Sequence, residues 1–114
     1  MPGSSRNPGS TTTIFNLIRR HQEAWQYFDS VCGRVDEVAA RQQGREITPE
    51  DEQVYEAASQ AECALLETLC DTPPQTVAGM RAAIEHFVKH EDGCEPEMSG
   101  HFLATLLLSP VLAA

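Results

Sequence analysis

The segment from residue 86 to residue 101 holds the chain's densest group of side chains that can bind a metal ion. His86 and His90 are four residues apart, so on a helix they share a face and both rings can reach one ion. No second well-spaced pair accompanies them, and the HExxH order with its catalytic glutamate is absent. The whole group comprises His86, His90, Glu91, Asp92, Cys94 and His101.

A helical projection places this histidine pair opposite Met80, Ile84 and Phe87. Because the apolar face of a helix packs inward, we expect His86 and His90 to face water. The sequence therefore predicts no metal and no cofactor. Metal binding by the His86/His90 segment stays open as the second of two alternative functions.

The other reactive side chains lack the neighbours that catalysis needs. Cys63 and Cys70 lie among glutamates, which disfavour the thiolate, and no CxxC pair occurs. His21 lies within an apolar seam, where a histidine is more often a core or interface residue than a base. The sequence has no nucleophile-elbow motif and no glycine-rich phosphate loop. We expect no enzymatic activity and no catalytic residues.

Acidic residues dominate the charge of the chain. The formal net charge is −9, and residues 46–80 hold eight acids and no lysine or arginine. Such a chain repels phosphate backbones and anionic membranes, so we expect neither direct nucleic-acid binding nor membrane binding. The acids could instead imitate a phosphate track towards a nucleic-acid-binding protein. They are Glu50, Asp51, Glu52, Glu56, Glu62 and Glu67.

Apolar periodicity and capping residues predict four helices that position these side chains. Thr48 and Thr76 each suit a helix start, and the glycine of Gln43–Gly44 suits a helix end. The first helix carries apolar residues at alternating spacings of three and four, which predicts one long seam. The expected helices run from Ile14 to about Gln43, Thr48 to Asp71, Thr76 to Gly93, and Pro96 or Ser99 to just before Pro110.

These elements predict an all-α fold, a small helical bundle in which a long antiparallel helical hairpin is followed by two short helices. We expect a disordered tail over residues 1–12, one helical domain over 13–109 and a C-terminal tail over 110–114. The two short helices are too short to cover the hairpin along its length. We therefore expect a second copy of the chain to cover the rest, as a homodimer.

The stretch from Asp71 to Ile84 contains the pattern Thr-Pro-x-x-Thr-x-Ala-Gly at residues 72–79. With the heptad helix that bears Trp25 and Phe28, it resembles short uncharacterised helical proteins of α-proteobacteria. The resemblance covers most of residues 14–90. It implies a bacterial or phage-related cytoplasmic protein and supports the helical fold, and it implies no catalytic residues.

The sequence favours a small, non-enzymatic regulatory or adaptor protein that binds an unidentified protein through apolar helix faces, with Trp25 and Phe28 as candidate contacts. The first alternative is an acidic, phage-type inhibitor that occupies a nucleic-acid-binding surface of its target. Its candidate contacts are Glu52, Glu56 and Glu67. The N-terminal residues are rich in Gly, Ser, Thr and Pro rather than apolar, so we expect a cytoplasmic location.

Overall fold

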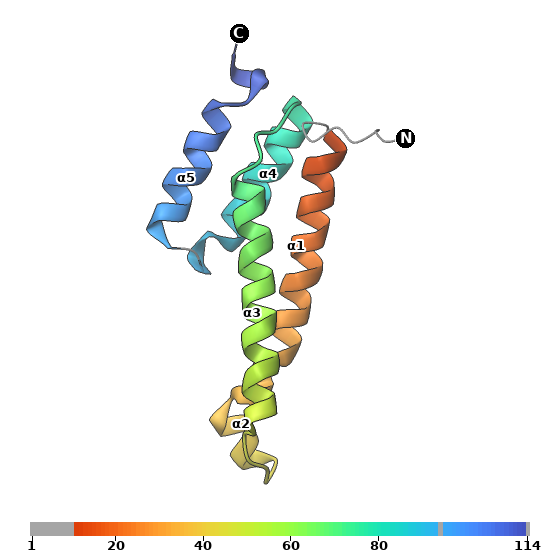
Figure 1. Ribbon diagram of the computed structural model, residues 1–114, viewed down its shortest axis with the longest axis vertical. Helices are drawn as coiled ribbons and strands as arrows, with labels where there is room; N and C mark the ends of the chain where they lie inside the picture. Colours follow the sequence, from red (N-terminus) through yellow and green to blue (C-terminus); the bar gives the residue numbers. More distant parts are fainter. Residues whose placement is uncertain (1–10, 94, 114) are drawn as a thin grey trace. The chain divides into compact units, whose positions relative to one another are not determined.

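The computed structural model describes residues 11–93 and 95–113 of the chain. This part is helical and contains no strand, which confirms the predicted all-α class (Figure 1). Of the predicted tail over residues 1–12, residues 1–10 lie outside the described part, as do Cys94 and Ala114. The elements are α1 Thr11–Val31, η1 Cys32–Val35, α2 Glu37–Gln42, α3 Pro49–Cys70, α4 Val77–His90, η2 Glu91–Gly93, α5 Pro96–Leu107 and η3 Pro110–Leu112.

The helices fall into two compact units. Unit 2 is the continuous segment 20–66, and unit 1 combines residues up to Arg19 with residues from Glu67 onward. Helices α1 and α3 each contribute residues to both units.

Unit 2 is an antiparallel hairpin in which α1 pairs with α3 through side-chain contacts in reverse order. His21 meets Glu62, with Nε2 and Oε2 2.7 Å apart, and seven residues further along α1 the ring of Phe28 lies 5.4 Å from that of Tyr55. Later residues of α1 therefore contact earlier residues of α3, so the two helices are antiparallel, as the predicted hairpin requires. Its apolar core is small, consisting of Val31, Ala40, Ala58 and Leu66.

The first predicted helix is interrupted rather than continuous to Gln43. It ends at Val31, and after the 3₁₀ turn η1 the extended residue Asp36 begins α2. Asp36 accepts hydrogen bonds from the backbone amides of Val38 and Ala39 at 2.9 and 3.2 Å. A short carboxylate offers the backbone this local alternative to a continued helix, and Asp is among the best N-cap residues. The predicted glycine end at Gly44 is confirmed by its positive φ of 68°.

The start of α3 is closed by reciprocal hydrogen bonds between Thr48 and Asp51. The Asp51 amide donates to Thr48 Oγ1 at 3.1 Å, and the Thr48 amide donates to Asp51 Oδ2 at 3.0 Å. This arrangement is a capping box with aspartate in the third position. Arg34 Nε also donates to Asp51 Oδ1 at 3.0 Å, and Arg45 Nη1 lies 3.7 Å from Oδ2. One carboxylate thus links η1 and the α2–α3 loop to the first turn of α3.

Apolar spacing in this part of the sequence predicts one inner face made of Val54, Ala58, Ala61, Leu65 and Leu69. The residues buried along α3 differ from this face. Ala58 and Leu69 are buried as expected, but Ala61 is exposed and its neighbour Glu62 is buried. The same spacing places Cys70 with Cys63 outside this face, on a second and weaker apolar stripe, but Cys70 is fully buried. The buried face of α3 differs from its apolar face because α3 packs against the buried His21 in unit 2. A buried imidazole requires a hydrogen-bonding residue opposite it.

Unit 1 joins the start of α1 and the end of α3 to α4 and α5. Thr76 caps α4 as predicted, accepting from the Gly79 amide at 3.0 Å. A Cβ on the buried Gly79 would lie 3.7 Å from Ile14 Cγ2, so the first turn of α4 packs closely on the start of α1. The buried apolar side chains of the unit are Ile14, Leu17, Ile18, Leu69, Cys70, Ala83, Phe87, Phe102 and Leu106.

Helix α5 is held within unit 1 along one side. The ring of Phe102 stacks on that of Phe87 with centroids 4.6 Å apart. Beyond the C-terminus of α5, the buried Ser109 hydroxyl donates to the carbonyl of Pro74. His101 contacts Asp71 at the end of α3. These attachments determine which side of α5 faces outward.

We predict that Asp51 makes stability depend on acid pH. The Thr48 backbone hydrogen bond and the neighbouring Arg34 hold the pKa of the Asp51 carboxyl below its ordinary value. A carboxyl with a lowered folded pKa stabilises the fold above its unfolded pKa of about 3.9, and this contribution is lost as pH falls through the folded value. The destabilisation by Asp51→Asn, from urea unfolding followed by circular dichroism, should therefore shrink as pH drops below about 4.

Glu50→Gln, next to Asp51 and exposed, is the matched control and should show a smaller change with pH. A destabilisation by Asp51→Asn that is the same at neutral and at acid pH would contradict the role given to this carboxylate.

Candidate functional site

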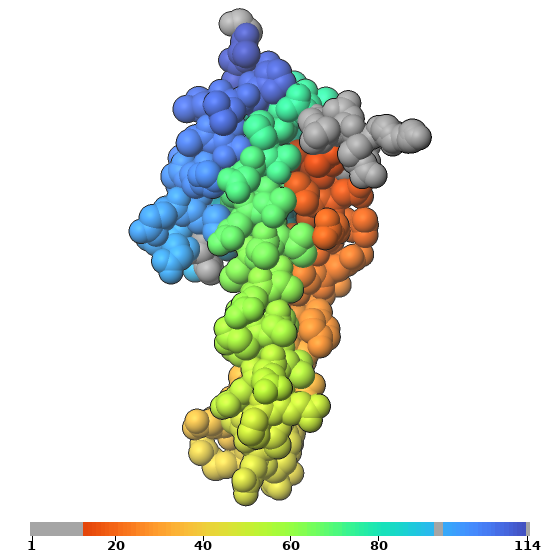
Figure 2. Space-filling model, viewed as in Figure 1, coloured from red at the N-terminus to blue at the C-terminus, as the bar shows by residue number. Residues whose placement is uncertain are grey.

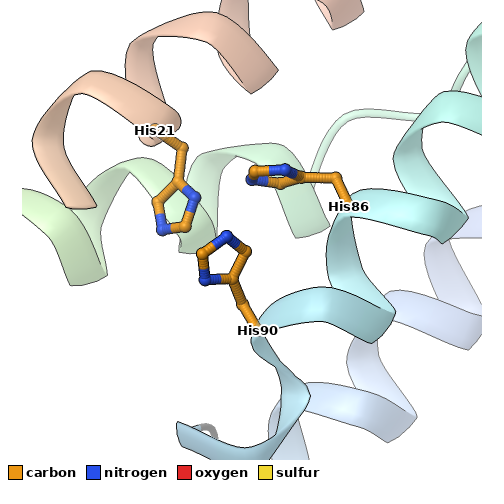
Figure 3. Close-up of side chains that lie close together, drawn as sticks. All are labelled: His21, His86 and His90. Carbon is orange, nitrogen blue, oxygen red and sulfur yellow. The ribbon is translucent and has the colours of Figure 1, made fainter. Parts of the chain in front are cut away.

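The histidine pair of α4 lies on the buried side of its helix. His86 is 4% exposed and His90 is half-buried, so the prediction that the pair faces water is wrong. Their ring centroids lie 4.6 Å apart. Figure 3 shows both rings leaving neighbouring turns of α4; its third labelled ring, His21, belongs to α1 and to unit 2.

The small residues of α4 explain why the sequence-based projection failed. The buried line runs through Gly79, Ala83, His86 and Phe87, at spacings of four, three and one. Small side chains allow a helix backbone to approach its neighbours closely, so they outcompete larger apolar residues for the inner face. Ile84, on the predicted inner face, is 38% exposed.

The remaining members of the predicted metal-capable group are not part of this pair. His101 is exposed and contacts Asp71, and Glu91 and Asp92 are exposed in η2. Cys94 lies outside the described residues. The structure therefore brings together His86 and His90 from the predicted group of six, on a single helix.

The predicted buried position of His21 is confirmed. Its side chain is fully buried, and Nε2 lies 2.7 Å from Glu62 Oε2. This distance makes the imidazole and the carboxyl group hydrogen-bonded partners. Glu62, one of the acids assigned to a possible phosphate-like track, is thus an internal partner within unit 2.

The aromatic contacts proposed from the sequence form a partly exposed cluster in unit 2. The rings of Trp25 and Phe28 lie 5.8 Å apart, and Phe28 lies beside Tyr55. Trp25 is 39% exposed, whereas Phe28 is half-buried. Phe28 therefore joins the two helices of the hairpin, and Trp25 offers the more accessible surface.

The three acids predicted to bind a basic partner are all exposed. Glu52 and Glu56 lie on the part of α3 in unit 2. Glu67 lies in unit 1, at a pocket of about 370 Å³. The other residues lining this pocket are Asp71, Glu95, Glu97, Met98 and His101.

A prominent apolar surface missed by the sequence interpretation lies on α5. Leu103, Leu107 and Leu108, here called the outer leucine face, are 61%, 75% and 74% exposed, while Phe102 and Leu106 are buried. In Figure 2 the α5 segment, in blue, lies on the visible surface. Three consecutive leucines at 106–108 were the available signal, because a helix cannot turn three successive side chains inward.

A second exposed apolar stripe follows α4. Val77 and Val88 are 72% and 57% exposed, and a groove of about 280 Å³ lies along the same helix over residues 77–85. Its lining residues are Val77, Met80, Arg81, Ile84 and Glu85. Arg81 and Glu85 form an exposed ion pair at its edge, with Nε and Oε2 3.1 Å apart.

No helix in the described part of the chain combines the length and the apolar character needed to cross a membrane. The chain matches no protein-family model, no curated protein and no solved structure.

We predict that Glu62 supports unit 2 through His21. Glu62→Leu should lower the free energy of unfolding by about 2–3 kcal/mol, because the buried imidazole loses its carboxylate acceptor. The double variant His21→Leu/Glu62→Leu should cost less than Glu62→Leu alone, since apolar side chains then replace both members of the pair. Chemical denaturation of the three proteins measures both differences.

Glu56→Leu is the control, because Glu56 is exposed on the same helix and should change stability by only about 0.5 kcal/mol. Equal costs for Glu62→Leu and Glu56→Leu would show that the His21–Glu62 contact does not stabilise the hairpin.

Proposed function

We propose that the protein is a small, non-enzymatic regulatory or adaptor protein that binds another protein through the outer leucine face of α5. The main support for this proposal is the exposure of Leu103, Leu107 and Leu108 on a helix whose other side is already packed. Several large apolar side chains exposed on one short segment favour a protein-binding surface. The sequence-based hypothesis of binding through apolar helix faces is kept, with α5 replacing Trp25 and Phe28 as the principal contact.

The inner contacts of α5 support this choice of surface. The Phe87–Phe102 stack and the Ser109–Pro74 hydrogen bond fix α5 along one side. Leu103 and Leu107 are four residues apart, so they share the opposite side. A partner that covers the outer leucines would remove these apolar side chains from water.

The charges near α5 indicate the chemistry of the partner. Glu95 and Glu97 are exposed at the start of the helix, and residues 96–107 contain no lysine or arginine. We propose a partner surface with an apolar groove flanked by Lys or Arg, because this combination complements both leucines and carboxylates. A second copy, also of net charge −9, offers less complementarity than a basic partner, so the predicted homodimer becomes an outcome of the test.

A bacterial cytoplasm is the proposed location. Cys32 and Cys63 are thiols, with Cys63 exposed, and cytosolic reductants preserve exposed thiols.

We predict that Leu103→Gln/Leu107→Gln abolishes capture of the partner. Tagged wild-type chain should recover a stoichiometric protein from a lysate of the source organism. Binding of that protein, purified, should weaken by at least roughly 100-fold in the double variant, since burying each leucine gains about 1.5–3 kcal/mol and every 1.4 kcal/mol is tenfold in affinity. Val38→Gln, which replaces a 54% exposed valine of α2, is the control and should bind as the wild type does.

The proposal fails if the double variant binds the purified partner with wild-type affinity while circular dichroism shows an unchanged helical content. It also fails if the wild-type chain is a dimer by light scattering and only the double variant is a monomer, because the second copy is then the occupant of the leucine face.

The acidic-inhibitor alternative gives a different result in the same assay. Glu52 and Glu56 are exposed on α3, as that hypothesis requires. It predicts that Glu52→Gln/Glu56→Gln weakens binding and that affinity falls steeply with salt. Binding through the leucine face predicts instead that Glu52→Gln/Glu56→Gln has little effect, whereas Leu103→Gln/Leu107→Gln weakens binding at low and at high salt.

A further inference from the structure

Two imidazoles in contact on one helix form an unusual feature of unit 1 that the proposed protein-binding function does not use. His86 is buried and His90 is half-buried, and their ring centroids are 4.6 Å apart. Both rings project from the same side of α4 (Figure 3). From this geometry we infer that His86 and His90 chelate a divalent late first-row transition-metal ion, with Zn²⁺ as the probe.

The spacing of the ligand atoms suits chelation. One ring nitrogen of His86 and one of His90 lie within 4.8 Å of each other. A tetrahedral ion with metal–nitrogen bonds of about 2.0–2.1 Å needs its ligand nitrogens roughly 3.4 Å apart. Side-chain rotation within the four-residue spacing covers this difference, as it does wherever two histidines one turn apart on a helix bind one zinc ion.

The helix holds the two ligands close together before the ion arrives. Helix α4 begins at a formed cap, where Thr76 accepts from the Gly79 amide, and its inner face is packed through Ala83 and Phe87. Ligands on a rigid, packed element lose less conformational entropy on binding than ligands on a loop. The backbone between the two histidines therefore needs no rearrangement.

The donor chemistry selects the class of ion. Imidazole nitrogen suits zinc, copper and nickel, whereas calcium and magnesium prefer oxygen ligands. Two histidines leave coordination positions for water or another ligand. This arrangement predicts a site that takes up Zn²⁺ and ignores Mg²⁺.

Calorimetric titration of Zn²⁺ into the full chain, kept in a non-chelating reductant, tests the inference. We expect one Zn²⁺ per chain, a melting temperature that rises with zinc, and no response to Mg²⁺. His90→Ala should weaken zinc binding by at least the roughly 10- to 100-fold that even outer-shell changes cause. His90 is the primary target because it is half-buried, and His86→Asn serves as the second variant.

Two matched controls separate the pair from other metal-binding groups. His101→Ala removes an exposed histidine of α5 and Cys63→Ser removes an exposed thiol of α3; both should leave zinc affinity unchanged. Co²⁺ bound in place of Zn²⁺ should give the wild-type protein a visible absorption spectrum that lacks a sulfur-to-metal band. This spectrum should disappear in His90→Ala. Absence of zinc uptake, equal affinity in His90→Ala, or loss of binding in Cys63→Ser or His101→Ala would each overturn the inference.

Discussion

The buried hydrogen bond between His21 and Glu62 is the constraint from which the rest of unit 2 follows. An imidazole with no exposed surface needs a partner, and Glu62 Oε2, 2.7 Å away, supplies it. Once these two residues face each other, the antiparallel register brings Phe28 opposite Tyr55 seven residues on. Further along, Arg34 of η1 reaches Asp51 at the first turn of α3. With few large apolar side chains buried in this unit, polar contacts set its register.

Unit 1 solves its packing problem in a different way and leaves a different surface. Small residues on α4 allow close approach to α1, as the Gly79–Ile14 contact shows, and the Phe87–Phe102 stack attaches α5. This arrangement puts His86 inside and Leu103, Leu107 and Leu108 outside. The buried histidine and the exposed leucines thus have one physical cause. The packed side of each helix determines which side chains are buried and which form the exposed surface.

The sequence predicted best what depends on local chemistry. Thr48, Thr76 and Gly44 mark helix ends through hydrogen bonds or a positive φ with near neighbours, so their roles followed from residue type. The break at Asp36 was missed because the apolar heptad continues past it, and periodicity says nothing of a competing cap. The burial of His86 was missed because the inner face of α4 was decided by packing against the rest of the chain.

The proposed function requires the outer leucine face to be uncovered in the isolated chain and covered by a partner. Hydroxyl-radical footprinting with mass spectrometry measures this directly, in purified protein and in lysate of the source organism. We expect labelling of Leu103, Leu107 and Leu108 in the purified chain and their protection in the lysate, while buried Leu106 is protected in both. Equal labelling of the three outer leucines in both samples would contradict it.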